Sequence, residues 1–281
     1  MKNLGTVESV YDFLKKLEGV LYVRRDQDRY LCRGQGSMSL KLRPKIGRYT
    51  YSGPRKQSGQ TQWQGNMRSM LCQFEREYQA HHRVDLPRRI DRLALAQHYG
   101  LATQFLDWTL NPLVALYFAC ERGNSSIADG IVFLLYSSEL PQLTNDADLN
   151  SNASVQILRP KRFDQRIVNQ DSVFTFHRDP LADFGEGPDG PREAVVVPDS
   201  AKLNIVQELA GIGIHRGFIY PGLASVCDRI NEAFRRSGSF EEERDSLMNM
   251  PSHHFDEELA DERAPYLTFD DRAEDGKPSS T

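Results

Sequence analysis

Residues 97–120 read QHYGLATQFLDWTLNPLVALYFAC, and they combine the strongest structural signals in the chain. A helical pattern ends at Gly100, and the apolar residues 102–106 are expected to form a short strand. The sequence Asp-Trp-Thr at 107–109 follows, where we expect a bend. The pattern therefore predicts polar side chains held rigidly between two regular elements, which is a position that suits a functional site.

The second half of this stretch is expected to be a capped helix. Asn111 is a favourable N-cap because its side chain accepts a hydrogen bond from an unpaired N–H, and Pro112 suits the first helical position. Gly123 follows the last apolar residue and is the expected C-cap. We therefore predict a helix that begins at Pro112, directly after the bend.

The composition of the chain is that of a soluble protein. Its 281 residues suit one large domain. No apolar run approaches the ~18 residues that a membrane-spanning helix needs. The N-terminus, MKNLGTVESVYDF, lacks the apolar core of a signal peptide, so we expect a cytoplasmic protein with no membrane partner. The widely spaced Cys32, Cys72, Cys120 and Cys227 are expected to be buried free thiols.

Charge is distributed unevenly along the chain. Residues 237–281 contain 13 acidic and 4 basic residues, a local charge of −9, whereas residues 1–236 contain 31 basic and 26 acidic residues, or +5. A mildly basic body suits a phosphate-bearing ligand. The acidic segment lacks hydrophobic periodicity and is expected to be a flexible tail, the alternative being a docking tail that folds on a partner.

Hydrophobic periodicity places the remaining elements. We expect an α+β fold, in which helices pack on mixed small sheets rather than alternating with strands in regular βαβ units. The expected elements are helices at residues 7–17, from Asn66, at 87–99, 199–209 and 222–236, strands around residues 30, 104, 133, 170 and 195, a hairpin at 20–33 and a surface loop at 43–65. The chain then divides into an N-terminal helix at 1–19, a domain at 20–236 and the tail at 237–281.

Arg33 and the bend supply the first candidate site residues. Arg33 ends a predicted strand beside Gly34, so its guanidinium could meet a phosphate while the backbone stays close. Asp107 and Thr109 precede a helix N-terminus, which favours anions. Ordinary structural roles remain open, because Arg33 could be a surface ion-pair partner and Asp107 could hydrogen-bond the turn.

Other polar residues are expected near this bend. Gln97, His98 and Tyr99 end the preceding helix, and Gln170 lies with Arg166 in a second polar strand region. His98 could equally be a core histidine, and Trp108 a core residue rather than a stacking platform. No phosphate-binding loop or metal-type spacing of histidines is found, so no bound metal is expected.

Several segments resemble the FRG domain family and occur in that family's order. These segments are YLCRGQ at 30–35, LRPKIGR at 42–48, FEREY at 74–78, the block at 96–120, DQRIVNQDSVFTFH at 164–177 and GIHRGFIYPGLASV at 213–226. Cys32 stands where the family usually has Phe, and Ala102 where it often has Pro. The family occurs in bacterial and phage-associated genes, so the resemblance implies a toxin or antiviral defence effector.

A second resemblance, to ADP-ribosyltransferases of the Arg–Ser–Glu type, implies chemistry and an ADP-ribosyltransferase-like core. Residues 30–34 resemble the strand whose Arg grips NAD, and residues 107–118 resemble the bend and helix that follow in those enzymes. The strand that should supply the catalytic Glu reads RIVNQDSVF, with Gln170 and no Glu. Losing a preorganised charge costs on the order of 10²–10³ in rate, so NAD binding is better supported than transfer.

The resemblance gives each candidate residue a role. Arg33, beside Gly34, would hold the NAD diphosphate or ribose, and Thr109 would support the ribose. Tyr99 or Trp108 would stack on nicotinamide, and His98 is a further catalytic candidate. Asp107 or Gln170 would polarise the glycosidic bond that breaks.

Two classes of function remain open at this stage. The first is an NAD-dependent ADP-ribosyltransferase that modifies a protein or nucleic acid, with NAD as substrate and a neutralising protein partner docking on the acidic tail. The second is a non-catalytic module that binds a nucleotide or RNA. A nuclease or other hydrolase has less support, because no cluster of carboxylates suited to a metal is visible.

Overall fold

The computed structural model describes residues 1–21, 30–49, 59–81, 85–121 and 127–236. The chain divides into two compact units, Met1–Phe240 and Glu241–Thr281, and all described residues belong to the first. The expected C-cap Gly123 and the tail at 237–281 therefore lie outside the described residues.

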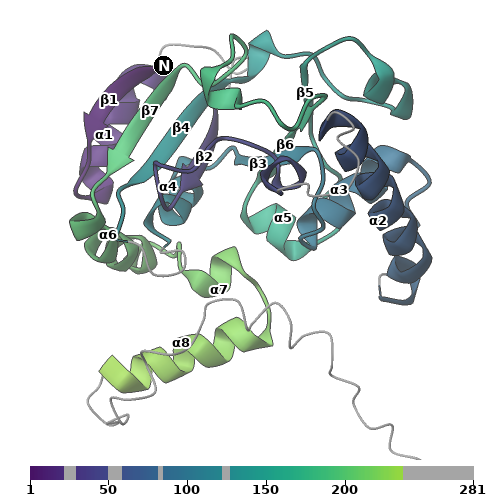
Figure 1. Cartoon of the computed structure of the whole chain (residues 1–281). Helices are drawn as coiled ribbons and strands as arrows, with labels where there is room; N and C mark the ends of the chain where they lie inside the picture. Colours follow the sequence, from purple (N-terminus) through teal and green to yellow (C-terminus); the bar gives the residue numbers. More distant parts are fainter. Residues whose placement is uncertain (22–29, 50–58, 82–84, 122–126, 237–281) are drawn as a thin grey trace, which may run out of the picture. The chain divides into compact units, whose positions relative to one another are not determined.

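The first unit is built on one mixed sheet of seven strands in the order β1-β7-β4-β2-β3-β6-β5 (Figure 1). The edge strand β1 runs parallel to β7, and every other neighbouring pair is antiparallel. The strands are β1 Lys2–Thr6, β2 Tyr30–Gln35, β3 Phe105–Thr109, β4 Gly130–Tyr136, β5 Val155–Leu158, β6 Ser172–His177 and β7 Glu193–Val197.

Helices cover this sheet and extend from it. They are α1 Val10–Leu21, α2 Gly59–His81, α3 Arg89–His98, α4 Pro112–Cys120, α5 Gln165–Asn169, α6 Asp199–Gly211, α7 Arg216–Ile219 and α8 Leu223–Arg236. Short 3-10 turns lie at Lys45–Arg48 (η1), Ser137–Glu139 (η2), Asp146–Asn150 (η3) and Phe184–Glu186 (η4). None of the helices among the described residues has both the length and the apolar character needed to cross a bilayer.

The central strand β4 explains where the core lies. Every residue of GIVFLLY is buried, as expected for a strand covered on both faces. Val132 and Leu134 face a cluster built with α1, α4 and α6, and Phe133 faces a second cluster that includes Leu42 and Phe184. The sheet is therefore the middle layer of the unit.

Helix α4 lies directly on strands β2 and β4. Its N-cap is the predicted one, because the Asn111 side chain accepts a hydrogen bond from the N–H of Leu113 at 3.0 Å. A Cβ added at Gly34, Gly36 or Gly130 would overlap a backbone carbonyl oxygen of residues 115–121. The close approach of helix and strands thus requires glycine at these positions.

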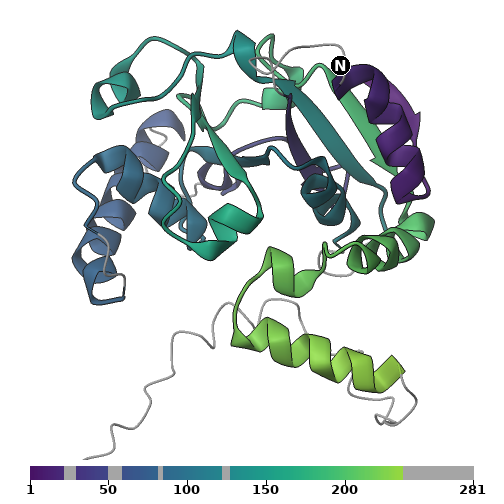
Figure 2. The same cartoon turned by 180° about the vertical axis from the view of Figure 1, so that it is seen from behind.

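The sheet has a seam between β2 and β3. Strand β2 pairs with β4 at six register positions, whereas it pairs with β3 only at Cys32 and Thr109. Helix α4 covers the half that contains β2, and α3 packs Ile90 and Leu93 on the half that contains β3. Figure 2 shows the two halves from behind. Backbone groups beyond the single pair must find other partners, and side chains can enter there.

The structure confirms the mixed α/β class and the strands predicted around residues 30, 133 and 195, and it places β3 and β6 just after the positions predicted at 104 and 170. It also corrects several details. The strands form one sheet, not small separate ones. Residues 107–109 belong to β3 and are not a bend. Residues 20 and 21 belong to α1, so the first strand of the predicted hairpin does not begin there, and residues 22–29 lie outside the described residues. Helix α2 begins at Gly59, ahead of the predicted start.

The cysteine prediction is half right. All four cysteines are free, but Cys72 and Cys227 are exposed, and only Cys32 and Cys120 are buried. Burial raises the pKa of the Cys32 thiol to about 12, so this thiol stays protonated at neutral pH.

Candidate functional site

Arg33 and Asp107 meet at the seam. The Arg33 Nη1 donates to the backbone carbonyl of Asp107 at 2.7 Å and lies 3.9 Å from its carboxylate Oδ2. The guanidinium thereby satisfies a carbonyl at the place where the β2–β3 pairing has ended. The Arg33 side chain is only 14% exposed, whereas that of Asp107 is 55% exposed. Water and ligands can therefore reach the carboxylate that lies beside a nearly buried cation.

Burial lowers the pKa of Arg33 to about 10, while Asp107 opposes this shift and the nearby Arg48 adds to it. This pKa is still well above neutrality, so the guanidinium remains charged. Its Nε is buried and has no hydrogen-bond partner among the described residues. This N–H is therefore an unpaired donor inside the protein.

Two side chains fix the orientation of the Asp107 carboxylate. The Gln97 amide nitrogen donates to Asp107 Oδ2 at 2.8 Å, and the Thr103 hydroxyl donates to the Gln97 carbonyl oxygen at 2.7 Å. Thr103 is 1% exposed. The carboxylate is therefore aimed by a chain of hydrogen bonds that begins in the core.

The turn η1 brings a second arginine to the same place. The Lys45 ammonium donates to the Gly100 carbonyl at 2.8 Å, and the Ile46 N–H donates to the Thr103 carbonyl at 3.4 Å. These bonds tie η1 to the α3–β3 connection, and Arg48 is near enough to lower the pKa of Arg33, while Asp107 opposes the lowering of the pKa of Arg48. From the sequence, Arg48 was predicted only to lie in the surface loop at 43–65.

His98 and Tyr99 lie on the other side of Gln97. His98 Nε2 is 3.1 Å from Asp164 Oδ1, and the Tyr99 hydroxyl donates to Asp164 Oδ2 at 3.4 Å. Burial lowers the pKa of His98, and Asp164 opposes this shift without reversing it. The imidazole is therefore mainly neutral at pH 7 and able to accept a proton. Asp107 also acts on the pKa of His98, which places both residues in one electrostatic environment.

A third polar group centres on Tyr220. The Tyr220 hydroxyl donates to Glu121 Oε1 at 2.8 Å, and the guanidinium carbons of Arg166 and Arg216 lie 4.8 Å and 5.4 Å from the Tyr220 ring centroid. Arg166 acts electrostatically on Glu121, Tyr220 and His98, so it connects this group to the previous one. Sequence reasoning missed Glu121, because its partner lies 99 residues away.

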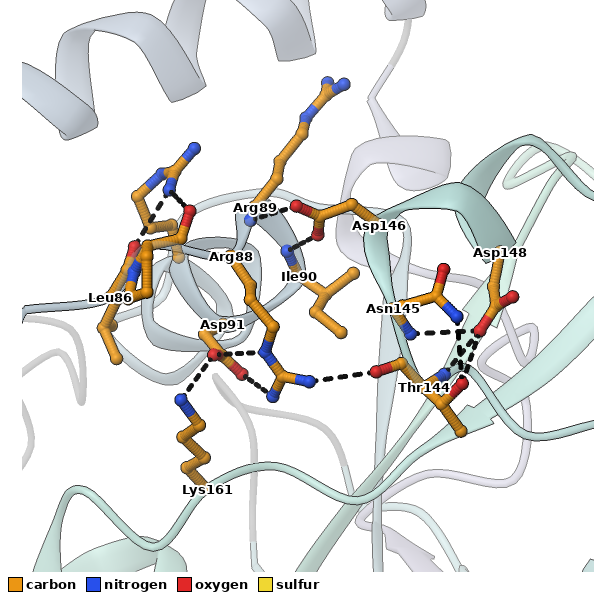
Figure 3. Close-up of polar contacts among 12 residues, drawn as sticks. Leu86, Arg88, Arg89, Ile90, Asp91, Thr144, Asn145, Asp146, Asp148 and Lys161 are labelled. Carbon is orange, nitrogen blue, oxygen red and sulfur yellow. Dashed lines mark hydrogen bonds and ion pairs between the residues drawn. The ribbon is translucent and has the colours of Figure 1, made fainter.

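A salt-bridge network holds the start of α3, whose far end carries Gln97 and His98. Asp91 is 2% exposed; Arg88 donates to both of its carboxylate oxygens at 2.8 and 2.7 Å, and Lys161 lies 2.9 Å away (Figure 3). The Asp146 carboxylate accepts from the backbone N–H groups of residues 89 and 90, both at 2.9 Å. These contacts satisfy donors that a helix start leaves unpaired and so fix the helix that presents the site residues.

Two of the predicted site residues, Trp108 and Thr109, are buried and bonded within the sheet. Trp108 is 2% exposed and its indole N–H donates to the Thr175 hydroxyl at 2.9 Å, so it is a core residue and leaves no ring face for nicotinamide. The Thr109 hydroxyl donates to the Gln170 carbonyl at 2.5 Å and accepts from the Asn111 N–H at 2.9 Å. It joins β3 to its neighbours and is 4% exposed.

Gln170 and Gly34 also have structural contacts that the sequence did not predict. Gln170 follows α5 and does not lie in a strand, and its side-chain amide donates to the carbonyl of Ile219 at 2.9 Å. Gly34 faces α4 rather than the ligand side of Arg33. The predicted residues that remain accessible at the site are Asp107 and Tyr99, with Arg33 and His98 behind them.

A comparison with protein-family models identifies this region. The model of the FRG domain matches residues 28–127, which include β2, η1, α3, β3 and α4. The chain therefore contains an FRG domain, and the seam with Arg33, Arg48 and Asp107 lies inside it. The comparisons with curated proteins and with solved structures each found no match to the chain.

A resident metal has no evident site in this region. Among the residues that the structure describes, no group of three or more His, Cys, Asp or Glu side chains is arranged to hold a metal ion. The expectation that no metal is needed stays a prediction.

Proposed function

We propose that the FRG domain binds NAD at the seam and transfers its ADP-ribose to a macromolecule. The observation that carries the proposal is the pairing of a charged, nearly buried Arg33 with an accessible, oriented Asp107 carboxylate at the point where two strands separate. This chemistry requires two charged groups. One is a cation that binds the diphosphate, and the other is an anion that stabilises the positive charge developing on the ribose. The resemblance of these residues to the NAD-gripping elements of ADP-ribosyltransferases supports the same assignment.

The residues at the site can be given roles in this reaction. The bond between nicotinamide and ribose breaks, nicotinamide leaves with the bonding electrons, and positive charge develops on the ribose. Asp107 stabilises that charge from a fixed position. An acceptor nucleophile attacks the anomeric carbon and loses a proton, which the neutral His98 accepts. The exposed ring of Tyr99 provides an aromatic surface for nicotinamide.

The acceptor in this proposal is a protein or a nucleic acid. A chain that modifies such molecules inside a cell acts as a toxin or defence effector, which calls for a neutralising protein partner. The acidic residues 237–281 are the segment to which that partner would dock.

Calorimetry and a transfer assay test the proposal. NAD should bind the full chain, and Arg33→Ala should weaken binding about 10- to 100-fold, as expected for loss of a hydrogen-bonded charge. Arg159→Ala is the matched control, because Arg159 is an exposed arginine outside the site. With labelled NAD and cell lysate, the wild type should transfer label. The proposal is wrong if no label transfers, or if Arg33→Ala transfers as much as the wild type.

One observation favours a second candidate, a non-catalytic module that binds a nucleotide or RNA. The strand region that should carry a catalytic Glu has Gln170, whose amide is already bonded to the Ile219 carbonyl. Tight RNA binding with no heat from NAD in the same titrations would support this module over the enzyme.

A further inference from the structure

We propose that Arg48 and Arg33 together form a two-arginine site for the diphosphate group of a dinucleotide. The inference deepens the proposed function, and it rests on that function for the identity of the ligand. It adds Arg48, a residue contributed by η1 from outside the β2 strand, and it assigns a ligand group to the two arginines.

The balance of charge around Asp107 is the first argument. Asp107 is the carboxylate that acts on both Arg33 and Arg48, so two positive charges share one negative charge. Desolvation lowers the pKa of both arginines, although Arg48 is exposed, and the charge of Arg48 lowers the pKa of Arg33 further. A dianionic ligand between them would remove this repulsion.

The second argument is that Arg48 is held in place. Ile46 is fully buried and packs with Trp63, Met67 and Ala102, while the Lys45 ammonium bonds to the Gly100 carbonyl. Gly47 lies so close to the Pro180 carbonyl that a Cβ there would overlap it. The turn that carries Arg48 is therefore fixed on three sides, and its side chain starts from a defined position.

The hydrogen-bond donors that remain on the two arginines suit a diphosphate. Arg33 uses Nη1 on the Asp107 carbonyl, and its Nε has no partner among the described residues but is itself buried, so the N–H groups left for a ligand are those of its terminal nitrogens. Arg48 uses Nε on the Arg43 carbonyl at 2.8 Å, which orients the guanidinium and leaves its terminal nitrogens for other acceptors. Oxygen atoms of a diphosphate accept from such donors, and planar guanidinium groups suit them.

Calorimetry with inorganic pyrophosphate as the probe tests the two-arginine site directly. Arg48→Ala should weaken pyrophosphate binding to the full chain about 10- to 100-fold, and so should Arg33→Ala. Lys41→Ala is the matched control, because Lys41 is an exposed cation seven residues before Arg48, and it should bind as the wild type. Arg48→Lys keeps the charge without the planar fork and should recover part of the loss. Circular dichroism checks that each variant keeps its fold.

Two further ligands decide which part of a nucleotide the site reads. Arg48→Ala should lose affinity for ADP-ribose, which has a diphosphate, and should keep its affinity for nicotinamide riboside, which has no phosphate. Equal pyrophosphate affinity in Arg48→Ala and wild type overturns the proposal. So does an Arg48→Ala effect that is confined to single-stranded RNA, because the ligand is then a nucleic-acid backbone.

The outcomes separate this inference from the proposed function. If pyrophosphate and ADP-ribose binding depends on both arginines but NAD is never consumed, the two-arginine site stands and the transferase proposal fails. If NAD is consumed while Arg48→Ala binds pyrophosphate normally, the transferase proposal stands and the role of Arg48 fails.

Discussion

Glu121 ends helix α4 with a carboxylate that is removed from water. Burial raises its pKa above the usual range, and the Tyr220 hydroxyl, Arg216 and Arg166 oppose the rise without cancelling it. The folded protein thus holds a proton on Glu121 more tightly than the unfolded chain does. Stability from this residue is complete below the unfolded pKa and is lost as the pH rises through the folded pKa.

Replacing Glu121 by Gln should remove this pH dependence, because the amide still accepts the Tyr220 hydrogen bond but carries no charge. The unfolding free energy of Glu121→Gln, relative to wild type, should increase as the pH is raised from about 4 to about 8. Urea denaturation at several pH values measures it. Glu77→Gln, an exposed position, is the control. A difference that stays flat or falls with pH would contradict the assignment.

At the scale of elements, α3 depends on the charge network at its start. Burial alone would raise the pKa of Asp91, but the hydrogen bonds from Arg88 and Lys161 outweigh it, and the net pKa lies below the usual value. This carboxylate therefore contributes stability above its unfolded pKa, and the contribution is lost as the pH falls through the folded pKa. The far end of the same helix presents Gln97 and His98 to the site.

We expect Asp91→Asn to destabilise the protein by about 1–3 kcal/mol at pH 7, because the charge-assisted contacts from Arg88 and Lys161 to a buried carboxylate are lost. The deficit should shrink in acid, because the unfolded carboxyl takes up a proton at a higher pH than the folded one, which weakens the advantage of the wild type. Urea unfolding at pH 7 and at about pH 3 gives both values. Asp85→Asn, an exposed aspartate four residues before α3, should differ little from wild type at either pH. A cost at pH 7 no larger than that of the control would show that the network does not hold α3.

An element that depends on neighbouring residues could be predicted from the sequence, and one that depends on pairing with a distant strand could not. The cap of α4 was predictable because Asn111 and Pro112 act on their immediate neighbours. Strand β3 was misplaced because Asp107 and Thr109 look like bend residues, and only pairing with β6 at all five positions makes them strand residues. The alternation of polar and apolar residues typical of a strand was visible in the sequence, since Trp108 lies between Asp107 and Thr109. In the strand, the side chain of Trp108 lies on the sheet face opposite to theirs.

The site was predictable only in part, for the same physical reason. Arg33 and Asp107 were expected together because a family resemblance joined them. Arg48, Glu121 and Asp164 were not, since their partners come from other segments and no local periodicity records such contacts. Thr109 was misjudged because the strand that buries its hydroxyl is formed by distant residues.

At the scale of the whole molecule, the first unit should keep its fold when the second unit is removed. The core clusters of the described residues lie between Leu4 and Tyr220. Deletion of residues 237–281 should therefore change the melting temperature of the first unit by no more than about 2 °C. Differential scanning calorimetry measures the change. A fall of several degrees would mean that the tail contributes to the fold.

The pairing of β1 with β7 has a consequence for how the chain is made. Lys2 is aligned with Glu193, and the backbone N–H of Val10 bonds to the carboxylate of Glu208. On a ribosome that adds ~5–20 residues per second, β1 waits roughly 10 to 40 seconds for its partner strand. During that time, β1, which is made before every other strand of this sheet, has its hydrogen-bonding edge uncovered. The nascent sheet is thus most open to chaperones, and to self-association, at the strand that waits longest for its partner.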